Sequence, residues 1–371
     1  MSASLRTGNL PAGAGSAGNA VIPARPMRVA RVVRETPDAV TLVLEDPTGA
    51  PVTFLPGQFF TVLATVEGVP LRRAYSASSA PGAEGASRVS LTIKRVPGGK
   101  VSNFLNDRIQ PGMALEVLGP SGHFTPDPST GGARHLVLLA GGSGITPLMS
   151  IARAALATEP ATSVSLIYGN RREQDILFRE ALAELARGYA GRFRLRYVLS
   201  EPPEEWQGGV GMLNRYVLED ELSVLPGLDA GPAAWFLCGP EPMMVEARAA
   251  LRSWGAKPER IHEERFSQPH LRSSASARSA SPPQPVEFRT RTRVQSVTVA
   301  EGMSILEAGL SAGVPLRYSC TMGGCGSCRV KLIEGQVLME EPNCLLPEER
   351  AQGQVLVCIG RPVTPVVLDV P

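Results

Sequence analysis

The chain has 371 residues, with 37 Lys and Arg side chains against 35 Asp and Glu and a formal net charge of +2. This length suffices for two or three domains with separate cores, and the near-neutral charge excludes a broad basic surface for nucleic acid. The longest apolar runs, such as Leu136–Ala140, are far shorter than the roughly 20 residues of a membrane-spanning helix.

Residues 1–26 are rich in Ala, Gly, Ser and Pro and lack the apolar segment of a signal peptide, so we expect a disordered leader. Six cysteines are present, and four of them form one pattern near the carboxyl terminus, which leaves Cys238 and Cys344. This usage is not a disulfide framework and favours a reducing compartment. The expected location is the cytoplasm.

Residues 27–131 contain short β-type runs separated by Gly and Pro, which predicts a small antiparallel barrel. The expected strands are Met27–Val33, Ala39–Leu44, Phe60–Thr65, Val89–Arg95 and Ala114–Leu118.

Two motifs in this region could hold a flavin. In Arg73-Ala-Tyr-Ser76, which we place after a strand, the Tyr can stack on the flavin, the Ser can bind the ring edge and the Arg can bind phosphate. Gly98-Gly-Lys-Val-Ser102 precedes a short predicted helix, whose first N–H groups and Ser102 hydroxyl could bind a pyrophosphate. The alternatives are a half-buried strand tyrosine, and a hairpin turn with Ser102 as helix N-cap. Both motifs in one domain favour the flavin.

Residues 132–266 alternate apolar strands with helical stretches, which predicts βαβ units and a parallel sheet. The expected strands are His135–Ala140, Ser163–Tyr168, Phe193–Leu199 and Ala234–Cys238, and the expected helices are Leu148–Leu156, Asp175–Arg187 and Glu241–Trp254.

Three strand ends in this region carry nucleotide-binding signals. The first strand enters the glycine-rich turn Gly141-Gly-Ser-Gly-Ile-Thr-Pro147, where backbone amides can reach a pyrophosphate. It matches neither Gly-x-Gly-x-x-Gly nor a Gly-Lys-Ser/Thr loop. Phe236-Leu-Cys-Gly-Pro-Glu-Pro242 repeats the strand-to-turn pattern and places Cys238 at a crevice, the alternative being an ordinary core cysteine. Arg171 and Arg172 end another strand and could pair with the 2′-phosphate of NADPH, or could simply be solvated.

Residues 267–285 are rich in Ser, Ala and Pro without hydrophobic period, so we predict a flexible linker before a third domain over residues 286–371.

Four cysteines in that last domain have the spacing of a plant-type 2Fe–2S site. Cys320, Cys325 and Cys328 have four and two residues between them, and 29 residues separate Cys328 from Cys358. Two bridged irons need four thiolates, and three can come from one tight loop whose glycines let N–H groups approach the sulfurs. Zinc is the alternative, but zinc ribbons usually pair two Cys-x-x-Cys units and only one is present.

Together these motifs resemble the ferredoxin–NADP reductase superfamily. More narrowly, the chain is similar to the reductase components of multicomponent oxygenases, of the phenylacetyl-CoA epoxidase and 3-ketosteroid hydroxylase type, in which flavin, nucleotide and ferredoxin domains follow in that order. The resemblance implies a multidomain fold: an antiparallel β-barrel flavin domain, an α/β parallel-sheet NAD(P) domain and an α+β ferredoxin-like (β-grasp) domain. It covers nearly everything from Met27 onward.

The resemblance also implies site residues and cofactors. The expected catalytic residues are Ser76, Cys238 and Glu264, the last in an ending with Phe266 that closes over the flavin. The expected cofactor-binding residues are Arg73, Tyr75, Ser76, Gly99, Val101, Ser102, Gly141, Gly142, Gly144, Thr146, Pro147, Arg171, Arg172, Cys238, Gly239 and Pro240. The expected metal ligands are Cys320, Cys325, Cys328 and Cys358. FAD is favoured over FMN, the donor is NADPH or NADH, and the two arginines favour NADPH.

The implied function is an NAD(P)H-dependent reductase that splits a hydride into single electrons and delivers them through a 2Fe–2S cluster. The expected acceptor is a terminal oxygenase, hydroxylase or desaturase, and the protein is expected to be monomeric. The alternatives are a stand-alone diaphorase, a nitrate-reductase-like electron donor, and a non-catalytic ferredoxin-type carrier.

Overall fold

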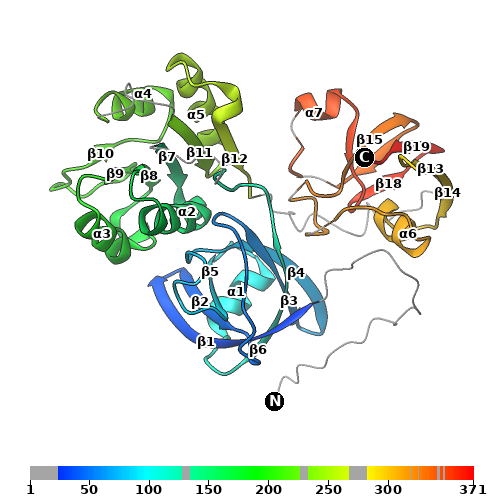
Figure 1. Ribbon diagram of the computed structural model, residues 1–371, viewed down its shortest axis with the longest axis horizontal. Helices are drawn as coiled ribbons and strands as arrows, with labels where there is room; N and C mark the ends of the chain where they lie inside the picture. The colour runs from blue at the N-terminus through cyan, green and yellow to red at the C-terminus, as the bar shows by residue number, and fades with distance from the viewer. Residues whose placement is uncertain are drawn as a thin grey trace. The chain divides into compact units, whose positions relative to one another are not determined.

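The computed structural model describes residues 24–127, 134–225, 233–266, 282–318, 320–324, 326–340, 343–345 and 347–371 (Figure 1). By their internal contacts the residues divide into two compact units. Arg25–Val62 and Ala74–Phe266 form one unit, which holds most of a first sheet and all of a second, and the other unit holds a third sheet. Residues 1–23 of the predicted leader and the predicted boundary between the first two domains lie outside the described residues. Arg25 and Pro26, which the prediction also assigned to the leader, belong to a strand instead.

The first sheet is a closed six-stranded barrel. Its strands, in the order β4-β3-β6-β1-β2-β5, are β1 Arg25–Thr36, β2 Ala39–Glu45, β3 Phe59–Val66, β4 Val69–Ser76, β5 Arg88–Lys94 and β6 Ala114–Ser121. An antiparallel bridge between Ala77, just after β4, and Leu91 in β5 joins the two ends of this order. Val101 and Leu105 of helix α1 (Lys100–Asp107) are buried. The predicted barrel is confirmed.

Strand β4 corrects one expectation. Arg73–Ser76 does not follow a strand but forms the end of β4. This strand is half-exposed over most of its length and contains Pro70, Arg72 and Arg73, so it lacks the apolar run by which the other strands are recognised.

The second sheet is parallel throughout and covered by helices on both faces (Figure 1). Its order is β10-β9-β8-β7-β11-β12, with β7 His135–Gly141, β8 Ser163–Asn170, β9 Phe193–Leu199, β10 Gly209–Val210, β11 Ala233–Cys238 and β12 Ile261–Glu264. The helices are α2 Ile145–Thr158, α3 Arg179–Gly188, α4 Arg215–Ser223 and α5 Glu241–Ser253. The predicted parallel sheet is confirmed, whereas β10, β12 and α4 were not anticipated.

Alternation along the central strand β7 explains the two layers. Leu136 and Leu138 share a core with α2 and α3, while Val137 and Leu139 share the opposite core with α4 and α5. The predicted helix at Asp175 begins only at Arg179, because residues 173–175 form a separate 3-10 turn and Phe178 adopts a positive φ of 58°.

The strand order reverses beside β7. From β7 the chain adds β8, β9 and β10 on one side and then returns to add β11 and β12 on the other. Ligands of open parallel sheets bind outside the carboxyl ends of the strands at such a reversal. In this sheet the reversal lies at the ends of β7 and β11.

The third sheet is mixed, with order β14-β13-β19-β15-β17, and only β13 and β19 pair in parallel. Its strands are β13 Gln284–Arg289, β14 Val294–Val299, β15 Arg329–Glu334, β17 Gln354–Leu356 and β19 Val366–Asp369; β16 Val337–Met339 pairs with β18 Gly360–Pro362, and the helices are α6 Ile305–Ser311 and α7 Pro347–Ala351. The predicted α+β class is confirmed. Since β13 begins at Gln284, the last two residues of the predicted linker belong to a strand, while residues 267–281 lie outside the described part.

None of the helices in the described residues has the length and hydropathy needed to cross a membrane.

Candidate functional site

The glycine-rich turn lies at the strand-order reversal. Strand β7 ends at Gly141, residues 142–144 form a 3-10 turn, and α2 starts at Ile145 without a side-chain cap. Gly142 has φ +52°, and a Cβ built there meets no atom within 4 Å. The Tyr168 hydroxyl donates to the Gly142 carbonyl over 3.0 Å, and the Thr146 hydroxyl donates to the Ser143 carbonyl over 3.0 Å. The backbone of this turn is therefore open to a ligand at Gly142, and the hydrogen bond from the buried Tyr168 fixes its conformation.

A second loop, Cys238-Gly-Pro240 after β11, packs directly against this turn. A Cβ on Gly144 would lie 2.0 Å from the Cys238 carbonyl oxygen, and a Cβ on Gly141 would lie 2.5 Å from the Met243 sulfur. A Cβ on Gly239 would also lie 2.8 Å from that sulfur. Close packing of the two loops thus requires Gly141, Gly144 and Gly239, whereas Gly142 is the glycine that faces open space.

Three residues expected to be catalytic come together at the ends of three strands. The Ser76 hydroxyl, at the end of β4, donates to a Glu264 carboxylate oxygen over 3.1 Å. Glu264 ends β12 and is the register partner of Cys238, which ends β11. Cys238 is fully buried, and burial together with the negative charge of Glu264 raises the pKa of its thiol well above the ordinary value. The sulfur therefore stays neutral at physiological pH and is not a nucleophile.

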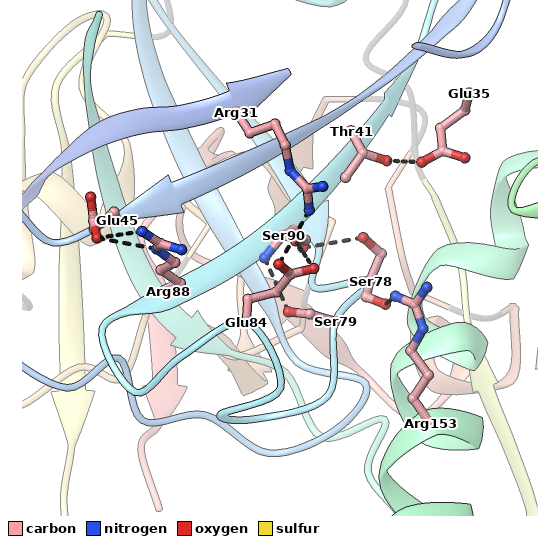
Figure 2. A network of polar contacts seen from close by, with 10 residues as sticks. All are labelled: Arg31, Glu35, Thr41, Glu45, Ser78, Ser79, Glu84, Arg88, Ser90 and Arg153. Carbon is pink, nitrogen blue, oxygen red and sulfur yellow. Dashed lines mark hydrogen bonds and ion pairs between the residues drawn. The ribbon is translucent and has the colours of Figure 1, made fainter. Parts of the chain in front are cut away.

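Helix α2 also binds the barrel directly, close to the flavin motif. The Ser150 hydroxyl donates to the Ser79 carbonyl over 2.7 Å, and an Arg153 N–H donates to the Ser78 carbonyl over 2.8 Å. Figure 2 shows Arg153 projecting from the helix onto Ser78. These contacts hold the segment just after Ser76 against the helix that begins at the glycine-rich turn. Nothing in the sequence pattern singled out Ser150 or Arg153.

The barrel side of this contact is itself tied together by polar side chains (Figure 2). The Ser79 hydroxyl accepts the Ser90 N–H over 3.0 Å, and the Ser90 hydroxyl donates to Glu84 over 3.4 Å. Glu84 in turn pairs with Arg31 over 3.3 Å. The carbonyls that accept hydrogen bonds from α2 thus belong to a segment that is itself hydrogen-bonded to strand β5.

The turn expected to bind the flavin phosphate leads into the predicted short helix α1, but Ser102 does not occupy the N-cap position that the alternative gave it. Gly99, not Ser102, is the N-cap of α1. The Ser102 hydroxyl lies in the first turn, accepts the Val96 N–H over 3.1 Å and donates to the Gly99 carbonyl over 3.4 Å. A Cβ on Gly99 would lie 2.7 Å from that hydroxyl. Ser102 therefore shapes the turn, and the N–H groups of the first turn of α1 carry no side-chain cap.

The other residues of the flavin motif are less informative. Tyr75 and Arg73 are half-buried in β4, and Arg73 donates to the Arg72 carbonyl over 2.6 Å.

Arg171 and Arg172 are both engaged by one carboxylate that the sequence did not reveal. The Arg171 Nε lies 2.6 Å from Glu201 Oε1, and the Arg172 Nε lies 2.8 Å from Glu201 Oε2. Glu201 follows β9 at the same edge of the sheet, and its N–H donates to the Arg171 carbonyl over 2.8 Å. Hydrogen bonds from the two guanidinium groups lower the pKa of Glu201, so the carboxylate is charged at neutral pH.

Three of the four predicted metal ligands are buried in the third domain. Cys320, Cys328 and Cys358 are at most 9% exposed, and Cys325 lies outside the described residues. The Cys328 thiol, burial and Cys320 together raise the pKa of Cys358, which places these thiols in one electrostatic group. The described residues contain no set of three His, Cys, Asp or Glu side chains that could hold one metal ion. A two-iron cluster divides its thiolates between two metals.

The loop around these thiols fits an iron–sulfur cluster. Gly323 and Gly326 both adopt positive φ, 72° and 71°, and the Met322 N–H lies 3.4 Å from the Cys320 sulfur. A backbone hydrogen bond from Gly323 to Cys358 opposes the rise in the pKa of that thiol. Backbone N–H groups that reach cysteine sulfurs stabilise thiolate charge, as a cluster requires.

Comparison with known families gives three consecutive matches. An oxidoreductase FAD-binding domain matches residues 26–125, an oxidoreductase NAD-binding domain matches residues 138–249, and a 2Fe-2S iron-sulfur cluster binding domain matches residues 290–363.

Curated proteins and solved structures agree with this order. The chain is 37% identical over 349 residues to a subunit of the 1,2-phenylacetyl-CoA epoxidase of Escherichia coli K12, covering 92% of this chain and 96% of the relative. It is 32% identical to the glycine betaine monooxygenase reductase subunit of Pseudomonas aeruginosa, covering 92% and 94%. A structure of phthalate dioxygenase reductase, described as modular for electron transfer from pyridine nucleotides to [2Fe-2S], aligns with a TM-score of 0.61 at 25% identity, covering 94% of this chain and 98% of that one.

Proposed function

This chain belongs to the family of oxygenase reductase components that join FAD-, NAD- and 2Fe–2S-binding domains, and we propose that its electron transfer is organised by the strand ends described above. It is an NAD(P)H oxidoreductase that delivers electrons to a partner oxygenase. The assignment of residues within this function is our proposal.

When bound, FAD supplies two-electron chemistry with the nicotinamide and one-electron chemistry with the cluster. The protein residues position these groups. In our proposal, Gly142 and the first turn of α2 bind the pyrophosphate of the nucleotide with backbone N–H groups. The neutral Cys238 packs against the nicotinamide. Because the thiol carries no negative charge, it does not repel the hydride during transfer.

Ser76 and Glu264 orient the flavin edge in this proposal. The Ser76 hydroxyl donates to Glu264 over 3.1 Å, which fixes the direction of the hydroxyl lone pairs. Arg73, Tyr75 and the first turn of α1 would hold the remainder of the flavin, with Gly99, Val101 and Ser102 forming that turn. Cys320, Cys325, Cys328 and Cys358 would hold the cluster.

One observation carries the proposal: Ser76, Cys238 and Glu264, from three strands far apart in the sequence, meet next to the open glycine-rich turn. A catalytic centre between flavin and nicotinamide needs such a meeting point, because the two rings must lie in contact for hydride transfer.

Finer points stay predictions. The preference for NADPH expected from Arg171 and Arg172 is one of them, because both arginines contact Glu201. FAD, in contrast, is supported as the flavin by the match to an FAD-binding domain. We propose a terminal oxygenase, hydroxylase or desaturase as the acceptor, a monomeric protein, and the cytoplasm as its location.

Anaerobic addition of NADH or NADPH to the purified holoprotein tests the function. We expect the flavin absorbance to bleach, followed by the electron paramagnetic resonance signal of a reduced 2Fe–2S centre. Protein that binds flavin but is not reduced by either nucleotide would contradict the proposal. If the flavin is reduced but no cluster signal appears, only the assignment of the iron–sulfur cluster is contradicted.

A further inference from the structure

Glu201 occupies the position where the two nucleotides differ chemically. NADPH carries a phosphate on the adenosine ribose where NADH carries a hydroxyl, and this ribose lies near the end of the strand after the pyrophosphate-binding turn in parallel-sheet nucleotide domains. That strand is β8, which runs directly into Arg171 and Arg172. The location of the ribose rests on the proposed function.

The carboxylate uses both of its oxygens on the two arginines. Oε1 contacts Arg171 at 2.6 Å and Oε2 contacts Arg172 at 2.8 Å, so Glu201 is placed as a 2′-phosphate would be, between two guanidinium groups. Two further backbone bonds hold the loop in place: the Ser200 N–H donates to the Asn170 carbonyl over 3.1 Å, and the Glu201 N–H donates to the Arg171 carbonyl over 2.8 Å. The carboxylate is thus presented by a fixed backbone.

The charges around the two arginines leave little attraction for an added dianion. Glu201 neutralises one positive charge and is the main cause of the raised pKa of Arg171, to which the charge of Asp175 adds a smaller part. The Asp175 carboxylate accepts the backbone N–H of Arg172 over 3.1 Å. Glu173, on the same turn, is paired with Arg179. The two arginines thus share one paired carboxylate, with a second carboxylate nearby on the same turn, and a phosphate monoester would add nearly two further negative charges.

We propose that Glu201 is the residue that decides between the nucleotides: it occupies Arg171 and Arg172 in place of a 2′-phosphate, and so makes NADH the preferred donor. NADPH must displace or approach this carboxylate, whereas the ribose 2′-hydroxyl of NADH carries no charge and can donate to it. The arginines that favoured NADPH on sequence grounds serve in this arrangement to hold Glu201.

The substitution Glu201→Gln tests this inference. It removes the competing charge and leaves both arginines available, so the ratio of kcat/KM for NADPH to kcat/KM for NADH should rise about tenfold. A tenfold change is the lower end of the effect expected for a charge-assisted hydrogen bond. We expect this lower value because all three side chains are exposed and solvent screens their charges. The gain for NADPH should shrink as ionic strength rises.

Binding gives a readout independent of catalysis. By isothermal titration calorimetry of the holoprotein, adenosine 2′,5′-bisphosphate should bind Glu201→Gln about tenfold more tightly than wild type, while the affinity for adenosine 5′-monophosphate should not increase. Glu204→Gln is the matched control, because it removes the same charge from an exposed position three residues along the same loop. It should leave both affinities and the kcat/KM ratio at wild-type values.

Failure of the inference and failure of its premise are distinguishable. If Arg171→Gln with Arg172→Gln weakens NADPH selectively but Glu201→Gln leaves the NADPH to NADH ratio unchanged, the ribose site stands and the role of Glu201 is overturned. If the double arginine variant affects neither nucleotide, the ribose does not lie at this strand end and the inference falls with its premise. An equal effect of Glu204→Gln would show that net charge, and not the contact with the arginines, sets the preference.

Discussion

The Ser76 hydroxyl donates to the Glu264 carboxylate over 3.1 Å although the two residues are 188 positions apart in the chain. Ser76 ends a strand of the barrel and Glu264 ends the edge strand of the parallel sheet. The bond therefore crosses from the predicted flavin-binding sheet to the predicted nucleotide-binding sheet, and Cys238 is the neighbour of Glu264 in the register.

We expect Glu264→Gln to slow reduction of the bound flavin by NADH about ten- to a hundredfold, the range of a lost charge-assisted hydrogen bond. Flavin content should be unchanged, because Glu264 acts on orientation. Stopped-flow absorbance under anaerobic conditions measures the rate. Glu259→Gln, an exposed carboxylate shortly before the same strand, is the control of equal charge. A wild-type rate in flavin-replete Glu264→Gln would remove this residue from the proposed catalytic group.

Two glycines of the same turn should respond differently to Ala. At Gly144 the new Cβ would lie 2.0 Å from the Cys238 carbonyl oxygen, so the two loops must separate, which costs about 1–3 kcal/mol of unfolding free energy. At Gly142 the Cβ meets open space, and the cost is limited to about 1–2 kcal/mol for a positive φ of 52°.

Thermal unfolding and steady-state kinetics separate these effects. Gly144→Ala should lower Tm more than Gly142→Ala does, whereas Gly142→Ala should raise KM for the nucleotide out of proportion to its loss of stability. If Gly142→Ala binds nucleotide as wild type does, the open face of this glycine does not contact the ligand.

Tyr168→Phe should raise KM for NADH and NADPH by the same factor. The hydroxyl donates to the Gly142 carbonyl over 3.0 Å and accepts the Leu177 N–H over 3.3 Å, so its loss frees the glycine-rich turn and leaves buried groups unpaired, at about 1–3 kcal/mol. Burial raises the pKa of Tyr168, which keeps the hydroxyl protonated, and this contribution to KM should therefore not vary between pH 6 and 9.

Tyr197→Phe is the matched control for Tyr168→Phe. Its hydroxyl is buried without a hydrogen-bond partner in the described part of the chain, so its removal should be neutral or stabilising. A change in the NADPH to NADH ratio in Tyr168→Phe would show that the effect reaches the ribose site and not only the pyrophosphate turn.

Cys328→Ala should eliminate the 2Fe–2S centre while flavin stays bound. Reduction of cytochrome c, which takes single electrons, should collapse, whereas reduction of ferricyanide by NAD(P)H, which can draw on the flavin directly, should largely survive. Iron content, flavin absorbance and the two assays check this in one preparation. Equal loss of both activities in folded, flavin-replete protein would contradict the division of labour between flavin and cluster.

Local sequence patterns predicted many of the strands and motifs of this protein. Strand Phe193–Leu199 was predicted with its observed bounds, and most other predicted strands differ by one to three residues at an end, because apolar periodicity reflects which side chains a strand buries. The cysteine spacing and the glycine-rich turn were also readable, since each is a short segment whose chemistry depends on neighbours in the chain. Half-exposed strands such as β4 and β12 were not predicted, because they bury too few side chains to produce an apolar periodicity in the sequence.

Tertiary structure alone decided which side chains meet. Arg171 and Arg172 were visible as a charged pair, but their partner Glu201 comes from the end of another strand, 30 and 29 positions away. Arg153 likewise looked like any helix residue until the fold placed it on the Ser78 carbonyl, 75 positions away. Parallel strands bring their carboxyl ends to one edge regardless of sequence separation. Contacts between side chains at that edge leave no periodic pattern in the sequence. The sequence therefore predicted which residues lie at this site, but not which of them contact one another.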